Sequence, residues 1–227
     1  MNIYDEGRVI LIDKPYRWTS FDVVKKIRNL TGAKRVGHAG TLDPLATGLL
    51  IVCTGKFTKD ISVIQNAEKE YTGSIYLGAT TSSYDRETEV LQNFNVDHVT
   101  SELINNTLAN FKGEIMQSPP LHSAVKVKGQ RAYKMARRGE DHILEAKPVT
   151  IKEFEITGLE LPHLRFRIVC SKGTYIRSLA HDLGKALNSG AYLYDLCRTR
   201  IGNYLLKDAV AVKDFKIEAD HIKPDPE

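Results

Sequence analysis

The segment from Val36 to Leu50, VGHAGTLDPLATGLL, holds the densest group of residues that could do chemistry. It offers one carboxylate, Asp43, and one imidazole, His38, between the glycines at positions 37, 40 and 48. Glycines at this density indicate unusual backbone angles or the close approach of another part of the chain. A carboxylate held in such a segment could act as a nucleophile or as a general base.

Two interpretations of Asp43 are open from the residues alone. Asp43 precedes Pro44, which keeps it out of the α region, and an Asp-Pro pair commonly forms a simple turn closed by an Asx hydrogen bond. The three glycines and the apolar run Leu49–Cys53 favour a second interpretation. In that interpretation a rigid loop presents the carboxylate above a buried strand or helix.

Several other kinds of site do not fit these residues. The loop lacks the spacing of a phosphate-binding P-loop or of a dinucleotide-binding motif. The seven histidines form no HExxH pair and no cysteine lies near them in sequence, so a dedicated metal site is not expected. There is no GxSxG motif for a serine nucleophile. The chemistry is therefore expected to come from a carboxylate, without a cofactor or metal.

A second cluster, CSKGTYIRSLAHDLG, spans residues 170–184. Thr174 is expected to cap a helix, which puts Arg177 in the first turn, where a cation meets the positive end of the helix dipole. Lys172, Arg177 and the helix N-terminus could together hold an anion such as a phosphate or a buried aspartate. Solvent screening is the alternative explanation.

Two tyrosines allow both a structural and a functional interpretation. Tyr175 lies beside Arg177, and Tyr71 lies in KEYTG. Each could be a core aromatic or a surface on which a base stacks.

A basic block runs from His122 to Arg138 and contains no acidic residue. Its cations are Lys126, Lys128, Arg131, Lys134, Arg137 and Arg138. In a chain whose formal net charge is only +4, this block suggests an anionic partner on one face. A solvated helix surface is the alternative.

The elements that position these residues alternate irregularly. Short apolar runs predict strands at 8–13, 71–78, 149–161 and 164–170. Helical spacing predicts helices over 19–32, with a Thr19–Asp22 capping box and Gly32 at its end, over 99–113 with Gly113 as C-cap, and over 176–187. No βαβ repeat is present, so we expect an α+β fold with a mixed, mainly antiparallel sheet and flanking helices.

Composition excludes several classes of protein. The 227 residues are 42% hydrophobic and 26% charged, which is typical of a globular chain rather than a disordered or fibrous one. No apolar run approaches the roughly 20 residues that span a bilayer, and the N-terminus does not resemble a signal peptide. The three cysteines are far apart, which favours reduced thiols in a cytoplasm.

Six segments, in order, resemble the TruB family of bacterial tRNA pseudouridine-55 synthases over almost the whole chain. They are DKPYRWTS (13–20), GHAGTLDPLATGLL (37–50), KEYTGSIYLGATTSSYD (69–85), FKGEIMQSPPLHSAVKVKGQRAYKMARRG (111–139), CSKGTYIRSLAHDLG (170–184) and GAYLYDLCRTRIG (190–202). The GHAGTLDP loop and the GTYIR turn are specific to the family. Arg17 and Thr88 stand where the family has glycine, which implies a different turn at Arg17 and leaves the loop at Thr88 open.

The resemblance implies roles for particular residues. Asp43 matches the catalytic carboxylate and Arg177 the arginine that pairs with it. Tyr71 matches the aromatic that stacks on the flipped uracil, and Tyr175 a second tyrosine at the substrate. His38 matches the histidine that enters the T-loop in place of the target. Leu196 matches a leucine of the pocket.

The resemblance also implies the domains and partners. Residues 1–205 would form the catalytic domain, with an active-site cleft across the sheet and a thumb-like RNA-binding insertion at about 112–147. Residues 206–227 would be a short tail without a full PUA domain. The substrate would be the T-arm of tRNA, bound by a cytoplasmic monomer with Lys126, Lys128 and Arg131 on phosphates, and no cofactor, guide RNA or membrane is expected.

Two alternatives stay open. The chain could be a non-catalytic RNA-binding or tRNA-folding module on the same scaffold. It could also resemble relatives that depend on a guide RNA, although those rely on an added RNA-binding domain and on partner proteins.

Overall fold

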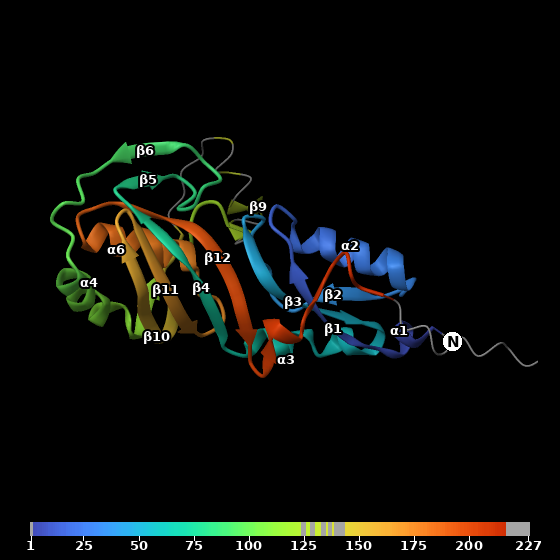
Figure 1. Cartoon of the computed structure of the whole chain (residues 1–227). Helices are drawn as coiled ribbons and strands as arrows, with labels where there is room; N and C mark the ends of the chain where they lie inside the picture. The colour runs from blue at the N-terminus through green and yellow to red at the C-terminus, as the bar shows by residue number, and fades with distance from the viewer. Residues whose placement is uncertain are drawn as a thin grey trace, which may run out of the picture. The chain divides into compact units, whose positions relative to one another are not determined.

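The computed structural model describes residues 2–123, 126–127, 130–132, 135, 138 and 144–216, and for residues 126, 127 and 131 it describes the backbone only. The chain forms two compact units (Figure 1). The first unit comprises the chain up to Glu70 together with the chain from Cys197 onward, and the second unit is Tyr71–Leu196. Strands β4 (Lys69–Leu77) and β12 (Ala191–Ile201) each contribute residues to both units.

The first unit is built on part of the main sheet that the described residues form. Its elements are α1 (Ile3–Glu6), β1 (Val9–Lys14), α2 (Ser20–Thr31), β2 (Val36–His38), β3 (Ala46–Thr54), η1 (Gly55–Lys59), α3 (Ile61–Asn66), β13 (Tyr204–Leu205), η3 (Leu206–Asp208) and β14 (Val210–Ala211). The central strand β3 pairs antiparallel with β1 and with β2, and β1 pairs parallel with β14. The sheet is therefore mixed.

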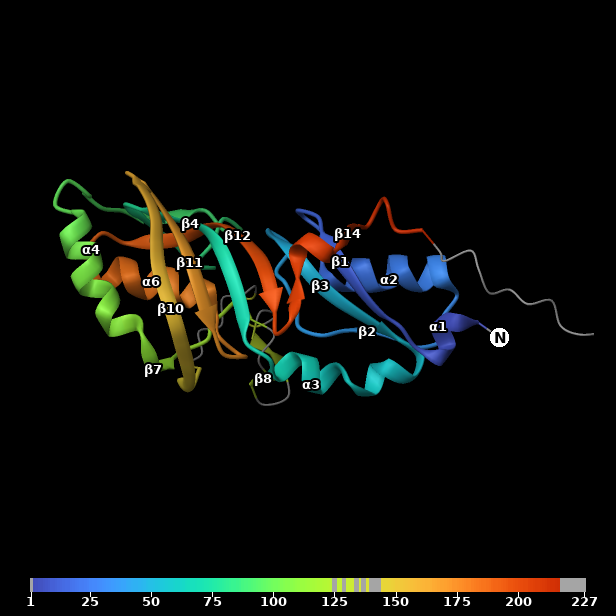
Figure 2. The same cartoon turned by 60° about the horizontal axis from the view of Figure 1, so that its bottom comes forward.

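Strand alternation gives this sheet two apolar faces. Ile10, Ile12, Leu50 and Val52 face α2 and form one core cluster with its side chains. The intervening β3 residues, Leu49, Ile51 and Cys53, form a second cluster against which Ile61 and Ile64 of α3 pack. Figure 2 shows α2 and α3 beside this sheet. Because β3 is buried on both faces, the loop that precedes it starts from a fixed support.

Helix α2 begins and ends as its sequence predicts. The hydroxyl of Thr19 accepts from the Asp22 N–H at 3.0 Å, and the Asp22 carboxylate accepts from the Thr19 N–H at 2.9 Å, which is a complete capping box. Gly32 ends the helix with φ 65°. The strand predicted at 8–13 is also confirmed as β1.

In the second unit, the described residues form further strands of the main sheet together with helices. Its elements are most of β4, β5 (Ala79–Thr81), β6 (Val90–Asn93), α4 (Ser101–Leu108), η2 (Ala109–Phe111), β7 (Gly113–Gln117), β8 (Lys126–Val127), β9 (Gln130–Arg131), β10 (Lys147–Glu160), β11 (His163–Cys170), α6 (Ile176–Ala186) and the first part of β12. The strand order is β12-β4-β11-β10-β7, while β5-β6 and β8-β9 form separate pairs.

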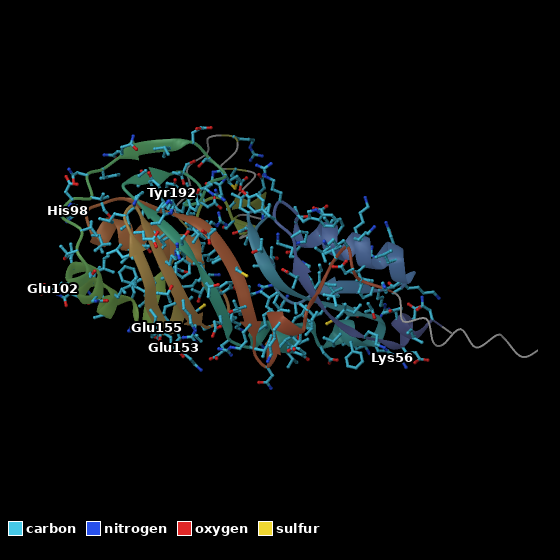
Figure 3. The ribbon with its side chains drawn as sticks, viewed as in Figure 1. Lys56, His98, Glu102, Glu153, Glu155 and Tyr192 are labelled. Atoms are coloured by element: carbon cyan, nitrogen blue, oxygen red, sulfur yellow. The ribbon has the colours of Figure 1, made fainter. Side chains whose placement is uncertain are left out.

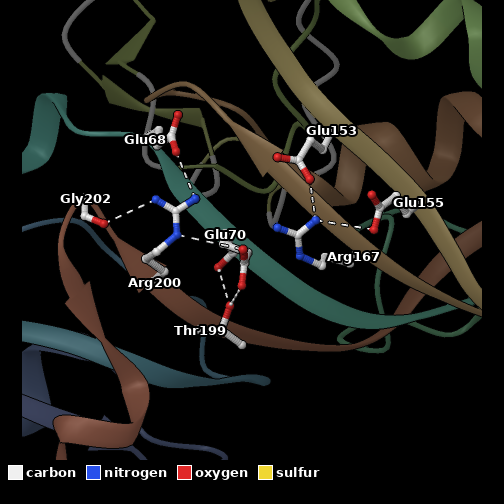
Figure 4. Close-up of polar contacts among 8 residues, drawn as sticks. All are labelled: Glu68, Glu70, Glu153, Glu155, Arg167, Thr199, Arg200 and Gly202. Atoms are coloured by element: carbon white, nitrogen blue, oxygen red, sulfur yellow. Dashed lines mark hydrogen bonds and ion pairs between the residues drawn. The ribbon is translucent and has the colours of Figure 1, made fainter.

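Helix α6 lies along one face of this sheet (Figure 1). Its buried side chains include Ile176, Leu179, Ala180 and Leu183, which recur at helical spacing as predicted. The opposite face carries polar side chains, such as Arg167 of β11, which pairs with Glu153 and Glu155 of β10 (Figure 4). Because α6 packs against the sheet through its apolar side, the position of its first turn within the unit is fixed.

Two predicted helix ends are wrong. Helix α4 stops at Leu108 and continues as a short 3-10 turn, so Gly113 is not its C-cap but the first residue of β7, with φ 85°. Thr174 does not cap α6, since its hydroxyl donates to Ser171 O at 2.9 Å. The predicted α+β fold with a mixed sheet is confirmed. Within the predicted tail from 206, β14 pairs with β1 at Ile12 and Asp13.

Candidate active site

The loop that carries Asp43 joins β2 to β3 in the first unit. Gly40 and Gly48 have φ of 104° and 97°, a conformation that side chains rarely adopt. A Cβ atom on Gly48 would lie 2.4 Å from the Arg198 carbonyl oxygen and 2.8 Å from its nitrogen. Gly40 is therefore required for the turn. Gly48 is required for the turn and also because β12, within this unit, approaches it closely.

Arg198 of β12 holds the loop by hydrogen bonds to its backbone. Its side chain is buried, with 1% of the residue exposed. It donates to three backbone carbonyls, from Nε to Leu49 at 2.8 Å, from Nη2 to Gly40 at 3.1 Å and from Nη1 to Thr41 at 3.4 Å. One planar guanidinium thus ties both sides of the loop together.

Lys14 holds the same loop from β1. It is fully buried, and Nζ donates to the carbonyls of Trp18 at 2.6 Å, Pro15 at 3.0 Å and Pro44 at 3.4 Å. The Arg17 N–H also donates to the Pro44 carbonyl, at 2.8 Å. Arg17 has φ 66°, a left-handed conformation that glycine adopts more readily than other residues.

Ser20, at the start of α2, also contacts the loop. Its hydroxyl donates to the Leu42 carbonyl at 3.1 Å and accepts from the Leu42 N–H at 2.9 Å. The residues on both sides of Asp43 are therefore held, Leu42 by Ser20 and Pro44 by Lys14 and Arg17. Asp43 itself is half-buried, and its carbonyl accepts from the Ala46 N–H at 3.1 Å. The sequence predicts a rigid loop before a buried strand or helix, and the structure shows a held loop before the buried strand β3.

The electrostatics of this loop are dominated by the two buried cations. Burial lowers the pKa of Lys14 to about 8, and the negative charge of Asp43 opposes that shift while Arg198 adds to it. Burial, followed by the charge of Arg198, lowers the pKa of His38 below its ordinary value. His38 is accordingly neutral at pH 7, and among the described residues its buried Nδ1 has no hydrogen-bond partner.

The second candidate cluster lies at the start of α6 in the second unit. The side-chain oxygen of Gln117 accepts from the Tyr175 N–H at 2.7 Å, and its Nε2 donates to the Tyr175 carbonyl at 3.0 Å. The Ser178 hydroxyl donates to the Ser118 carbonyl at 2.8 Å. The turn before α6 is thus fixed by Gln117, the last residue of β7, and by Ser118, which follows it. Tyr175 is half-buried in this turn.

Arg177 is buried in the first turn of α6, with 4% exposed. Its guanidinium donates to the carbonyls of Ser83 at 3.1 Å and His122 at 3.0 Å, and Nε lies 3.7 Å from the carboxylate of Asp85, which is also buried. Sequence reasoning expected Arg177 to meet an anion but missed Asp85. The only available signal was an acidic residue in the TTSSYD segment.

Two further candidates lie on strands that border or belong to the second unit. Tyr71 is buried on β4, and Leu196 is half-buried on the neighbouring strand β12. In the basic block, Lys126 of β8 is paired in register with Arg131 of β9. Lys128 and the side chains of Lys126 and Arg131 lie outside the described residues.

The structure brings some predicted residues together. In the first unit, His38 ends β2 and Asp43 lies in the loop that follows it, while Tyr175 and Arg177 share the start of α6 in the second unit. The pairing of Asp43 with Arg177 would join the two units and stays a prediction. Within the described part of the chain, no three His, Cys, Asp or Glu side chains are grouped to hold a metal ion, and no helix is long and apolar enough to cross a membrane.

Comparison with known proteins gives close similarities. Residues 28–176 match the family described as "TruB family pseudouridylate synthase (N terminal domain)". The chain is 54% identical over 220 residues to "tRNA pseudouridine synthase B" of Flavobacterium johnsoniae, which covers 94% of this chain and 96% of that protein. It is 52% identical over 218 residues to the protein of the same name from Phocaeicola vulgatus, with 93% of each chain covered.

Solved structures agree on the fold. A chain in the crystal structure of a Cbf5-Nop10-Gar1 complex aligns with a TM-score of 0.73 and 31% identity over 93% of this chain. A chain in the structure of an H/ACA RNP bound to a substrate RNA containing 2'-deoxyuridine aligns with a TM-score of 0.69 and 27% identity. This chain spans about half of those chains, 54% and 53%.

Proposed function

The chain belongs to the TruB family of pseudouridylate synthases, and we propose from this premise that it isomerises uridine 55 in the T-loop of tRNA to pseudouridine. The protein is a tRNA pseudouridine synthase, an isomerase. In the reaction the N1–C1′ bond of the uridine breaks, the uracil turns, and a C5–C1′ bond forms. The proton on C5 is released and N1 gains one, so no oxidant, reductant or transferable group is consumed.

The target base has to leave its stack before it can react. Flipping a base costs a few kcal/mol of lost stacking. Stacking on an aromatic side chain recovers about 1–3 kcal/mol per base, and the proposal assigns this to Tyr71. His38 would occupy the place that the base vacates. Its neutral state at pH 7 suits insertion among stacked bases, because no charge has to be desolvated.

Asp43 is the proposed catalytic carboxylate, acting as nucleophile or general base. The observation that carries this role is the fixed loop around it, held by the buried cations Arg198 and Lys14 and by Ser20. A weak nucleophile becomes effective when it is held in a reactive position, since the entropic cost of positioning is already met. Asp43 and Lys14 also interact electrostatically, since the negative charge of Asp43 opposes the lowering of the Lys14 pKa.

Three residues of the second unit complete the proposed site. Arg177 would pair with Asp43 in the complex, while Asp85 and two carbonyls hold the guanidinium in one orientation. Tyr175 would contact the substrate from the turn that Gln117 fixes. Leu196 would form part of the wall of the uracil pocket.

The proposed partner is the T-arm stem-loop of tRNA, bound by a monomer in the cytoplasm. Residues 1–205 would act as the catalytic domain, with the insertion at about 112–147 closing on the RNA and residues 206–227 as a tail. Phosphate contacts would come from Lys126, Lys128 and Arg131. No guide RNA is required in this proposal, because the protein itself would recognise the folded T-arm.

The test is release of tritium from tRNA transcript labelled at uridine C5. The isolated protein should release tritium from a T-arm stem-loop and should release none when uridine 55 alone is replaced by cytidine. A non-catalytic RNA-binding module would bind the stem-loop and release nothing. Release that requires an added guide RNA would contradict the proposal of a stand-alone enzyme.

A further inference from the structure

The loop from Thr81 to Thr88, between β5 and β6, holds Arg177 at two points. The Ser83 carbonyl accepts from Nη1 at 3.1 Å, and the Asp85 carboxylate lies 3.7 Å from Nε. Ser83 and Asp85 are both buried. The residue between these two contacts is Tyr84, and the mechanism described so far gives it no role.

Tyr84 has an unusual conformation that its surroundings maintain. Its φ is 62°, in the left-handed region that is rare for a bulky residue. Its ring stacks on the ring of His181, with centroids 3.9 Å apart and planes 13° from parallel. Its carbonyl accepts from the Leu193 N–H of β12 at 2.9 Å. The strained residue is therefore held both by its ring and by its backbone.

His181 lies on α6 four residues after Arg177, and residues at that spacing lie on one face of a helix. The same face of α6 thus meets the 81–88 loop twice, through Arg177 on Ser83 and Asp85 and through His181 on Tyr84. The ring stack adds to the contacts that Arg177 and the Leu193 N–H already make with the loop. Two contacts one helical turn apart fix the loop relative to the guanidinium.

The Asp85 carboxylate is aimed by hydrogen bonds within the same loop. Its Oδ1 accepts from the Ser83 hydroxyl at 2.6 Å and from the Glu87 N–H at 2.9 Å. The Thr81 hydroxyl donates to the Asp85 carbonyl at 2.7 Å, and the Ser83 N–H donates to the Thr88 hydroxyl at 3.1 Å. The carboxylate is therefore rigid relative to the loop, and its place relative to Arg177 depends on where the loop is held.

The two rings meet as uncharged groups. Burial lowers the pKa of His181, an effect that the adjacent Asp182 opposes and Lys185 supports. Burial raises the pKa of the Tyr84 phenol. The buried Nδ1 of His181 has no hydrogen-bond partner in the described part of the chain. The contact is thus ring on ring, which makes packing, rather than proton transfer, the property to test.

We propose that Tyr84 and His181 are positioning residues, whose stack holds the 81–88 loop so that Ser83 and Asp85 orient the Arg177 guanidinium for the reaction. This inference rests on the proposed function, because it takes Arg177 as the partner of the reacting carboxylate. It predicts that losing the stack slows the chemical step and leaves tRNA binding intact, since neither ring is needed to bind phosphate.

The experiment compares ring-keeping and ring-removing variants. Tyr84→Asn removes the ring and keeps a residue that tolerates φ near 60°, whereas Tyr84→Phe keeps the ring. We expect the single-turnover rate of tritium release to fall about tenfold or more in Tyr84→Asn. Tyr84→Phe should retain the wild-type rate, and the dissociation constant for tRNA should be unchanged in both.

Variants at the other ring provide an independent arm should Tyr84→Asn fail to fold. His181→Ala should lose rate as Tyr84→Asn does, and the double variant should be no slower than either single variant, because both remove one interaction. His181→Phe should keep the rate. An inactive His181→Phe would show that the imidazole nitrogens matter rather than the stack, and would overturn the proposal.

His98→Ala is the matched control. His98, labelled in Figure 3, lies with Nε2 2.8 Å from the Leu187 carbonyl at the C-terminal end of α6, so the variant removes an interaction with the end of the same helix, away from the loop. It should keep the wild-type rate. A wild-type rate in Tyr84→Asn would overturn this inference alone, whereas absence of release by the wild-type protein would overturn the proposed function.

Discussion

Replacing Arg198 with Met should loosen the loop that carries Asp43. The side chain is almost completely buried and is the donor to the carbonyls of Leu49 and Gly40, at 2.8 and 3.1 Å. The third contact, to Thr41 at 3.4 Å, is long and adds little. Met replaces the aliphatic part of the Arg side chain and has no donor, so the variant leaves the buried Leu49 carbonyl and the partly buried Gly40 carbonyl without this partner.

The expected magnitude follows from these two bonds. Each buried acceptor that loses its partner costs about 1–3 kcal/mol, or about 2–6 kcal/mol together. Removing a buried cation recovers part of that cost, because its desolvation is no longer required. We expect a net loss of about 3 kcal/mol in the free energy of unfolding. In a chain of this length, that corresponds to a melting temperature lower by about 6–12 °C.

Arg200→Met is the control, two residues away on the same strand. Arg200 is partly exposed and pairs with Glu68 at 2.8 Å and with Glu70 at 3.8 Å (Figure 4). An ion pair of this kind contributes about 0–1 kcal/mol. Thermal melts should therefore separate the two variants clearly. Single-turnover tritium release at a temperature where both are folded should be slow in Arg198→Met and near wild type in Arg200→Met.

The reasoning about the loop would be refuted if the two variants melted together. It would also be refuted if Arg198→Met kept the wild-type rate, since a loop that works without its guanidinium does not depend on it for position. Arg198→Lys is an intermediate change between wild type and Arg198→Met. It keeps the charge but not the planar fork, and we expect it to be slower than wild type.

Three further predictions concern the other charged groups. Asp85→Asn leaves the buried Arg177 without its carboxylate, so urea unfolding should show a loss of about 3–5 kcal/mol and the rate should fall with tRNA affinity unchanged. Folding lowers the pKa of Lys14 from 10.5 to about 8, so the unfolded chain holds more protons between these values. The stability of wild type relative to Lys14→Met should therefore rise between pH 8 and pH 10.5 in urea titrations. Neutralising the three proposed phosphate-binding cations in the 122–138 block should flatten the salt dependence of tRNA binding. The slope should fall by about one unit for each phosphate that is no longer neutralised. An unchanged slope would place the phosphate-binding cations elsewhere.

Local patterns were sufficient for several parts of the fold. The Thr19–Asp22 capping box and Gly32 define α2 because every interaction involved lies within a few residues. Gly40 and Gly48 of the Asp43 loop likewise have the positive φ angles that glycine favours, whereas Gly37 lies in β2 without one. The apolar run Leu49–Cys53 indicates a buried strand or helix, and the structure shows that it is a strand buried on both faces.

The features of the fold and site that the sequence could not predict depend on long-range contacts. Thr174 is a good capping residue, but the backbone before α6 is instead satisfied by Gln117, which lies 58 residues away from Tyr175. Ser83 is 94 residues from Arg177, and no spacing rule connects them. Lys14 and Arg198 are residue types that are normally exposed, so their burial follows only from the carbonyls that the folded loop turns toward them.

The central claim is that the Asp43 carboxylate, held by a rigid loop, performs the isomerisation of a tRNA uridine. Single-turnover tritium release by Asp43→Asn, measured beside its tRNA dissociation constant, tests it most directly. We expect no detectable release by a folded protein whose affinity for tRNA is unchanged. Release at a rate near that of the wild-type protein would contradict it, as would activity and binding lost together.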